Sequence, residues 1–261
     1  MTFIKLSTTV AKYVLALLMV SSLLACVSET VSTTKRQVDK QKALELHVKL
    51  AQGYVSKGNR ESARLHLGKA FDINKRSPEA TLVLAQLYEL EGEPALAEET
   101  FKKAIRLKKD FTEAHNSYGI SLFNAKRYEE ALSQFERAAA DLGYDGRAEA
   151  LVNVGRTAVQ LGKKQRAHAA FEHATVLNRD LPPAFIELAD LNFQEQNYAE
   201  AKQNLDRFMA LTSATPRALL IGIRLERIFG NKDKEASYLL MLKNKFPYSR
   251  EYLEYKDTLA H

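Results

Sequence analysis

Few residues of this 261-residue chain have the types and spacings that catalysis needs. His168 and His173 are five residues apart, which places them on different faces of a helix, so we expect surface or half-buried histidines and no metal site. Carboxylate pairs such as Glu98-Glu99 and Glu129-Glu130 fall at expected helix starts, where negative charge favours the helix dipole. The sequence contains no glycine-rich phosphate loop, His-Glu-x-x-His pair or Gly-x-Ser-x-Gly elbow. We therefore expect neither enzyme activity, nor a cofactor, nor a small-molecule substrate.

The charges of the chain do not indicate nucleic-acid binding. It has 38 Lys and Arg against 32 Asp and Glu, a formal net charge of +6. The densest basic run lies between Lys102 and Lys109, but Glu98, Glu99 and Asp110 flank it and no aromatic platform interleaves with it. We expect this run to be a solvated surface, with contact to anionic lipid headgroups or cell-wall polymer as the alternative.

The single cysteine, Cys26, is the residue with the clearest chemistry. One cysteine cannot form an intramolecular disulfide or a zinc site built on cysteine pairs. Residues 1–25 carry two charges, both lysines, and the apolar run from Val14 to Leu24 has the length of a signal-peptide core. Leu23-Leu24-Ala25-Cys26 resembles the lipobox of bacterial lipoproteins, which implies cleavage before Cys26 and acylation of that cysteine. The alternative is a plain secretory signal or membrane anchor with an incidental cysteine.

The residues after Cys26 bear on where such a lipoprotein would be held. Val27 stands where an aspartate would signal inner-membrane retention in that class, so we expect an outer-membrane lipoprotein facing the periplasm of a Gram-negative bacterium. Two or more acyl chains anchor a protein stably, at about 0.8 kcal/mol for each buried methylene. Residues 26–43 are rich in Ser, Thr and charge, and we expect the lipidated cysteine and a flexible tether there. Without residues 1–25 the chain has 36 basic and 32 acidic residues, a net charge of +4.

From residue 44 onward the sequence repeats itself about every 34 residues. Each copy has an alanine near the start of an expected second helix, a large apolar residue four positions later and usually another alanine three positions after that. These markers are Ala63/Leu67/Ala70, Ala97/Phe101/Ala104, Ala131/Phe135/Ala138, Ala167/Phe171/Ala174, Ala201/Leu205/Phe208 and, more weakly, Ala236/Leu240/Lys243. Small residues in the first helices are expected where the two helices of a hairpin cross closely: Ala51, Ala85, Gly119, Gly155 and Ala189.

This pattern resembles the tetratricopeptide repeat (TPR), a helix-turn-helix unit of 34 residues. The resemblance implies an all-α fold, a superhelical solenoid of six helix-turn-helix repeats followed by a C-terminal capping helix. The expected repeats are 44–77, 78–111, 112–147, 148–181, 182–216 and 217–248, and residues 249–261 are the expected capping helix and tail. The sixth copy has Arg224 or Leu225 at the small position and Lys243 at the last marker, which leaves its register open by one residue.

The TPR resemblance also implies a binding groove. On the family pattern, the fifth and twelfth residues of each first helix face the concave side of the solenoid, and here most of them are apolar, which indicates a protein partner. The predicted groove residues are Val48, Val55, Leu82, Asn116, Phe123, Val152, Val159, Ile186 and Phe193, with Glu89, Ile221 and Ile228 at the remaining positions. The alternative is that some of these side chains pack against the neighbouring repeat.

The lipobox, polar tether, six repeats and capping helix together are similar to the PilF/PilW family of type IV pilus biogenesis lipoproteins. The resemblance implies a pilotin, which binds the pilus secretin, helps it reach the outer membrane and promotes assembly of its multimeric ring. Acyl chains on Cys26 would provide membrane attachment while the groove holds a secretin segment. The alternative is another periplasmic TPR scaffold lipoprotein, serving outer-membrane protein insertion or cell-wall synthase activation.

Overall fold

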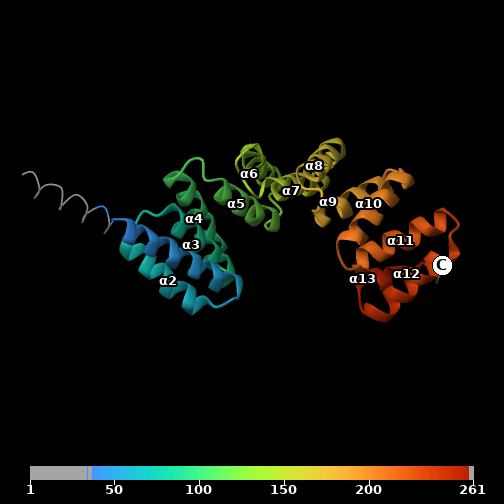
Figure 1. Ribbon diagram of the computed structural model, residues 1–261, viewed down its shortest axis with the longest axis horizontal. Helices are drawn as coiled ribbons and strands as arrows, with labels where there is room; N and C mark the ends of the chain where they lie inside the picture. The colour runs from blue at the N-terminus through green and yellow to red at the C-terminus, as the bar shows by residue number, and fades with distance from the viewer. Residues whose placement is uncertain (1–33, 35–36, 259–261) are drawn as a thin grey trace, which may run out of the picture. The chain divides into compact units, whose positions relative to one another are not determined.

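The computed structural model describes residue 34 and residues 37–258, which form helices joined by short connections (Figure 1). The first helix runs through residues 37–56. The helices after it are α2 Arg60–Ile73, α3 Pro78–Glu91, α4 Pro94–Leu107, α5 Thr112–Asn124, α6 Tyr128–Ala140, α7 Arg147–Gln160, α8 Lys164–Leu177, α9 Pro182–Gln194, α10 Tyr198–Leu211, α11 Pro216–Ile228, α12 Lys232–Lys245 and α13 Arg250–Asp257. In these described ranges there is no strand, and no helix has the length and apolar character needed to cross a membrane.

Consecutive helices pair as antiparallel hairpins, one for each repeat. The pairs are α3 with α4, α5 with α6, α7 with α8, α9 with α10 and α11 with α12, while the first helix shares a core cluster with α2. α13 packs on α11. The predicted all-α TPR solenoid with six repeats and a C-terminal helix is therefore confirmed.

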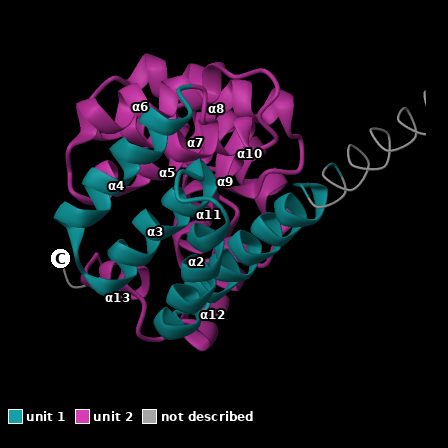
Figure 2. Cartoon of the chain, turned by 90° about the vertical axis from the view of Figure 1, so that its left-hand side faces the viewer, with its two compact units in different colours: residues 1–109 teal, residues 110–261 magenta. Residues whose placement is uncertain are grey.

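The chain divides into two compact units, shown in different colours in Figure 2. The described part of the first unit, which ends at Lys109, contains the first helix and α2 to α4. The second unit begins at Asp110 and contains α5 to α13, which make up four hairpins and the capping helix.

The predicted marker residues form the packed interior of the helical hairpins. In the first five repeats every marker residue is buried, and the rings of Phe101, Phe135 and Phe171 are at most 1% exposed. The ring of Phe135 lies against Gly119, where an added Cβ would come within 2.7 Å of two ring carbons. A small residue in the first helix is thus what allows a large residue of the second helix to fill the space between them.

Each hairpin turn contains one residue in the left-handed backbone region. These residues are Gly58, Gly92, Lys126, Gly162, Gln196 and Gly230, and they recur at intervals of 34 residues, with one interval of 36. The two extra residues lie between α6 and α7, in a connection of six residues, 141–146, where the other connections between repeats have four. The structure therefore explains the uneven spacing in the sequence by one longer loop.

The sixth repeat corrects the predicted register. Ala236, Leu240 and Lys243 are exposed, and the residues at the corresponding distances from the N-cap of α12 are Glu235, Leu239 and Leu242, one residue earlier. The two helices of this hairpin also approach closely at another residue than predicted. The small residue is Gly222 and not Arg224 or Leu225, because a Cβ on Gly222 would be 2.8 Å from the ring of Tyr238.

The predicted tether is also too long at its C-terminal end. Residues 37–43 belong to the first helix, so helix is already present seven residues before the predicted first repeat. Gln, Lys and Ala in this stretch favour helix, and the Gln41 amide donates to the Glu45 carboxylate one turn later, at 2.9 Å. The predicted signal peptide and Cys26 lie outside the described residues.

Candidate protein-binding site

Three of the nine predicted groove residues belong to the core. Leu82, Val152 and Ile186 are 7%, 2% and 7% exposed, so they cannot present a surface to a partner. The reason is visible in the second unit, where the first helices of neighbouring repeats contact one another. Ile186 of α9 and Ile221 of α11 share one core cluster, so the fifth position of these helices packs between repeats. For Ile186 the alternative interpretation, packing against the neighbouring repeat, is therefore correct.

The other predicted groove residues keep part of their surface. Val48, Val55, Asn116, Phe123 and Phe193 are half-buried and Val159 is exposed. Two of them also close their own hairpins, because the Phe123 and Phe193 rings contact Tyr128 and Tyr198 at centroid distances of 5.3 and 5.6 Å. The aromatic residues at the twelfth position therefore contribute to both packing and surface.

In the second unit, polar contacts connect consecutive first helices. The Asn153 amide of α7 donates to the Asn116 side-chain oxygen of α5 at 3.3 Å. Further along, Arg156 of α7 pairs with Glu187 of α9 at 2.8 Å. The predicted apolar stripe is therefore interrupted by paired polar groups at neighbouring positions, and the sequence pattern alone missed these pairs.

The same chain of contacts continues to the last helices. Arg217 of α11 donates to Glu187 at 2.9 Å and also pairs with Asp190. Burial of Arg217 opposes its charged form, but hydrogen bonds and charge attraction from Glu187 and Asp190 outweigh this and raise the pKa of the guanidinium. These ion pairs fix the spacing of neighbouring first helices and leave few unpaired charges among them.

One pocket opens among these helices, with a volume of about 300 Å³. It is lined by Ile120, Phe123, Asn124, Phe135, Asn153 and Arg156. Only Phe123 of this set was among the predicted groove residues. Ile120 and Arg156 are the ninth residues of their predicted repeats, so a pattern that reads only the fifth and twelfth positions cannot find them.

The chemistry of this pocket is that of a binding site for an apolar side chain. Ile120, Phe123 and Phe135 provide apolar walls, and Asn124 and Asn153 add amide groups, which can hydrogen-bond to a peptide backbone. Ile120 is 42% exposed, so the pocket is open to solvent on the side of α5. Among residues 37–258 no three metal-ligating side chains cluster.

Comparison with known proteins identifies the family. Two family models described as tetratricopeptide repeat match the chain, one over residues 48–110 and 92–146 and the other over 148–181. The type IV pilus assembly protein PilF of Pseudomonas aeruginosa is 35% identical over 243 residues, which are 93% of this chain and 96% of PilF. The chain belongs to the PilF family of type IV pilus TPR proteins.

Solved structures agree with membership in the PilF family. A structure from the functional characterization of Pseudomonas aeruginosa PilF has a TM-score of 0.79 and 36% identity, and the match covers 84% of this chain and 99% of PilF. The crystal structure of PilW, a widely conserved type IV pilus biogenesis factor, has a TM-score of 0.70 and 25% identity, covering 81% of this chain and 97% of PilW. The PilF/PilW resemblance predicted from the sequence is thus confirmed.

Proposed function

We propose that this PilF-family chain is an outer-membrane lipoprotein that faces the periplasm and acts as a pilotin. In this proposal it binds the type IV pilus secretin and promotes its localisation to the outer membrane and its multimerisation. Support comes from the similarity to PilF over nearly the whole chain and from the lipobox sequence that ends at Cys26. The observation that carries the binding step is the open apolar pocket beside Ile120 and Phe123.

The pocket suits one large apolar side chain of a secretin segment. Burying such a side chain contributes about 1.5–3 kcal/mol, which alone gives weak binding. Acyl chains on Cys26 and the secretin's own path to the membrane would confine both partners to one surface, where the effective concentration compensates for the weak contact. Because the membrane raises the effective concentration in this way, a small pocket is sufficient for secretin binding.

Capture of the secretin by the full-length protein tests this proposal. Ile120→Glu puts a charge at the mouth of the pocket, and we expect it to lower secretin recovery at least tenfold without changing the melting temperature. Leu142→Glu is the matched control, because Leu142 is 80% exposed and lies outside the pocket. Enrichment of a cell-wall synthase or an outer-membrane insertion factor in place of the secretin would overturn the pilotin proposal in favour of the scaffold alternative.

A further inference from the structure

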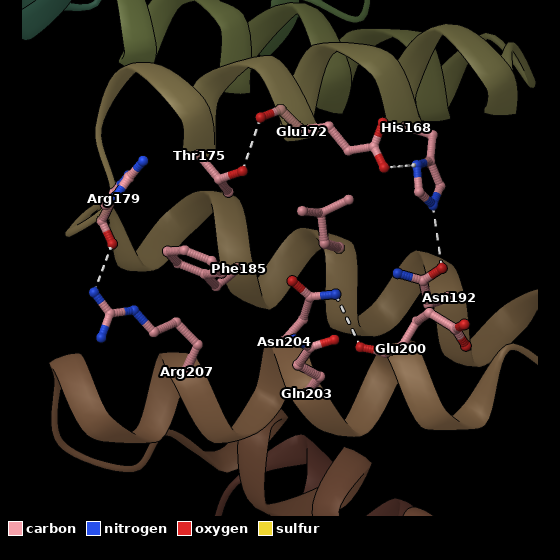
Figure 3. Close-up of a pocket in the computed structure, with 11 residues that line it drawn as sticks. His168, Glu172, Thr175, Arg179, Phe185, Asn192, Glu200, Gln203, Asn204 and Arg207 are labelled. Atoms are coloured by element: carbon pink, nitrogen blue, oxygen red, sulfur yellow. Dashed lines mark hydrogen bonds and ion pairs between the residues drawn. The ribbon is translucent and has the colours of Figure 1, made fainter.

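A second, larger concavity lies between α8 and α10, with α9 as its floor (Figure 3). Its volume is about 740 Å³. The floor uses Phe185, Leu188 and Asn192, whereas Glu187 and Asp190 of the same helix pair with Arg217. At 100° per residue these two sets lie on roughly opposite faces of α9. This groove is therefore separate from the pocket beside Ile120.

The two ends of the groove carry opposite charges. Arg179 and Arg207 lie together at one end, and Glu172 and Glu200 lie towards the other (Figure 3). On α10 the step from Glu200 to Arg207 is seven residues. At 1.5 Å per residue the two charged groups are about 10 Å apart along α10. A ligand of one charge sign would meet repulsion at one of them.

Several lining side chains are held in place by other residues of the unit. Arg207 donates to the Arg179 carbonyl oxygen at 3.0 Å and to Asp180 at 2.8 Å, and its guanidinium lies 5.8 Å from the centroid of the Phe185 ring. At the other end, His168 contacts both Asn192 and Glu172, at 3.1 and 3.3 Å. The shape of the groove is therefore set before any ligand enters.

Other lining groups remain available. Within the described part of the chain, the Arg179 guanidinium, the Glu200 carboxylate and the Gln203 amide have no side-chain partner, and all three residues are exposed. They provide a positively charged hydrogen-bond donor, a negatively charged hydrogen-bond acceptor and an amide that can both donate to and accept from a peptide backbone. Leu188 and Phe185 add apolar floor between them.

We propose that this groove binds an extended peptide segment of another protein, with an acidic residue at the arginine end and a basic residue three to four positions away. An extended chain rises about 3.3 Å per residue, so three to four residues span the distance between the charged ends. Residues two positions apart point the same way along such a segment, so at a spacing of four an apolar residue midway faces the floor on the same side as both charged residues. This inference goes beyond the pilotin proposal, because the ligand is defined by the order of its acidic and basic residues and need not be the secretin.

Binding of labelled peptides to the full-length protein in detergent micelles tests this inference. The probe is Asp-Ser-Leu-Ser-Lys with blocked ends, and the comparison peptides have Asp or Lys at both charged positions. We expect the mixed peptide to bind at least fivefold more tightly than either comparison peptide. In the Arg179→Glu variant the peptide with two lysines should bind more tightly than the mixed peptide. In the Glu200→Lys variant the peptide with two aspartates should bind more tightly than the mixed peptide.

Matched controls separate recognition from a change in net charge. Glu129 and Arg137 are exposed residues in the first and last turns of α6 and do not line the groove, so Glu129→Lys and Arg137→Glu make the same changes of net charge outside it. Gln203→Trp fills the groove and should abolish binding of all three peptides. Equal affinity for the three peptides, no binding at millimolar concentration, or the same change of preference in the α6 controls would overturn the proposal. Secretin capture is a separate measurement, so either proposal can fail alone.

Discussion

The ring of Phe135 in α6 lies directly against the backbone of Gly119 in α5, and a methyl group on Gly119 would sit 2.7 Å from two of its ring carbons. Phe135 is only 1% exposed, so the ring is closely packed on this side and must shift if a methyl group is added. We expect Gly119→Ala to lower the free energy of unfolding by about 1–2 kcal/mol, the cost of overpacking less the gain in helix propensity.

Gly68 supplies the comparison for this prediction, since it lies inside α2 with nothing within 4 Å of an added Cβ. Gly68→Ala should raise the free energy of unfolding by up to about 1 kcal/mol, the difference in helix propensity. Chemical denaturation of the two variants measures both effects. A Gly119→Ala variant as stable as the parent would show that the hairpin can open around the ring.

The turn residue Gln196 has a φ of +64°, a backbone conformation that glycine adopts freely and other residues adopt at a cost. Gln196→Gly should stabilise the protein by about 0.5–1 kcal/mol, after allowing for the greater flexibility of glycine in the unfolded chain. Gly162, at φ +69° in the preceding repeat, provides the reciprocal test. Gly162→Ala should destabilise by about 1 kcal/mol, and a neutral result for both would contradict the strain argument.

The first repeat should lose stability in mildly acidic solution. His66 and His47 face each other with their Nδ1 atoms 3.1 Å apart, and burial, followed by the charges of His47 and Lys69, lowers the pKa of His66. The unfolded chain therefore takes up a proton first, so stability is complete above the ordinary pKa of 6.5 and falls as pH drops below it.

Amide hydrogen exchange in the first repeat, at pH 7.5 and at pH 5, measures this effect after correction for the intrinsic exchange rate. His66→Phe keeps a ring beside Tyr54, which stacks on His66 at 5.4 Å, but it cannot titrate. We expect the variant to lose less protection than the parent on acidification. His173→Gln, an exposed position, should leave the parent's pH response unchanged.

The proposed membrane attachment through Cys26 predicts that location can be changed without a change in folding. Cys26→Ser should give a protein with the parent's helicity that fractionates with the soluble periplasm, and secretin rings should decrease. Cell fractionation and helicity by circular dichroism measure the two properties. Unchanged recovery in the outer membrane would reject acylation of Cys26.

The repeat pattern predicted the helices well because each hairpin needs a small residue opposite a large one, and both recur in the sequence. It failed by one residue in the sixth repeat, where the contact uses Gly222 and Tyr238. The groove was harder to predict. Whether a first-helix residue faces solvent depends on how the next repeat packs, and a pair such as Arg156 and Glu187 joins residues 31 positions apart. No periodicity within one helix encodes such a pair.

The longer connection after α6 folds back onto the helix that opens its own repeat. Asp141 accepts from the Thr112 hydroxyl at 2.5 Å and from the backbone N–H of Gly143 at 2.9 Å. Both contacts stay within residues 112–147, so the third repeat carries its closing contacts with it. In a chain assembled from exchangeable units, this is the one we would choose to transplant whole, because replacing its connection alone with a four-residue one would remove the carboxylate that accepts from Thr112.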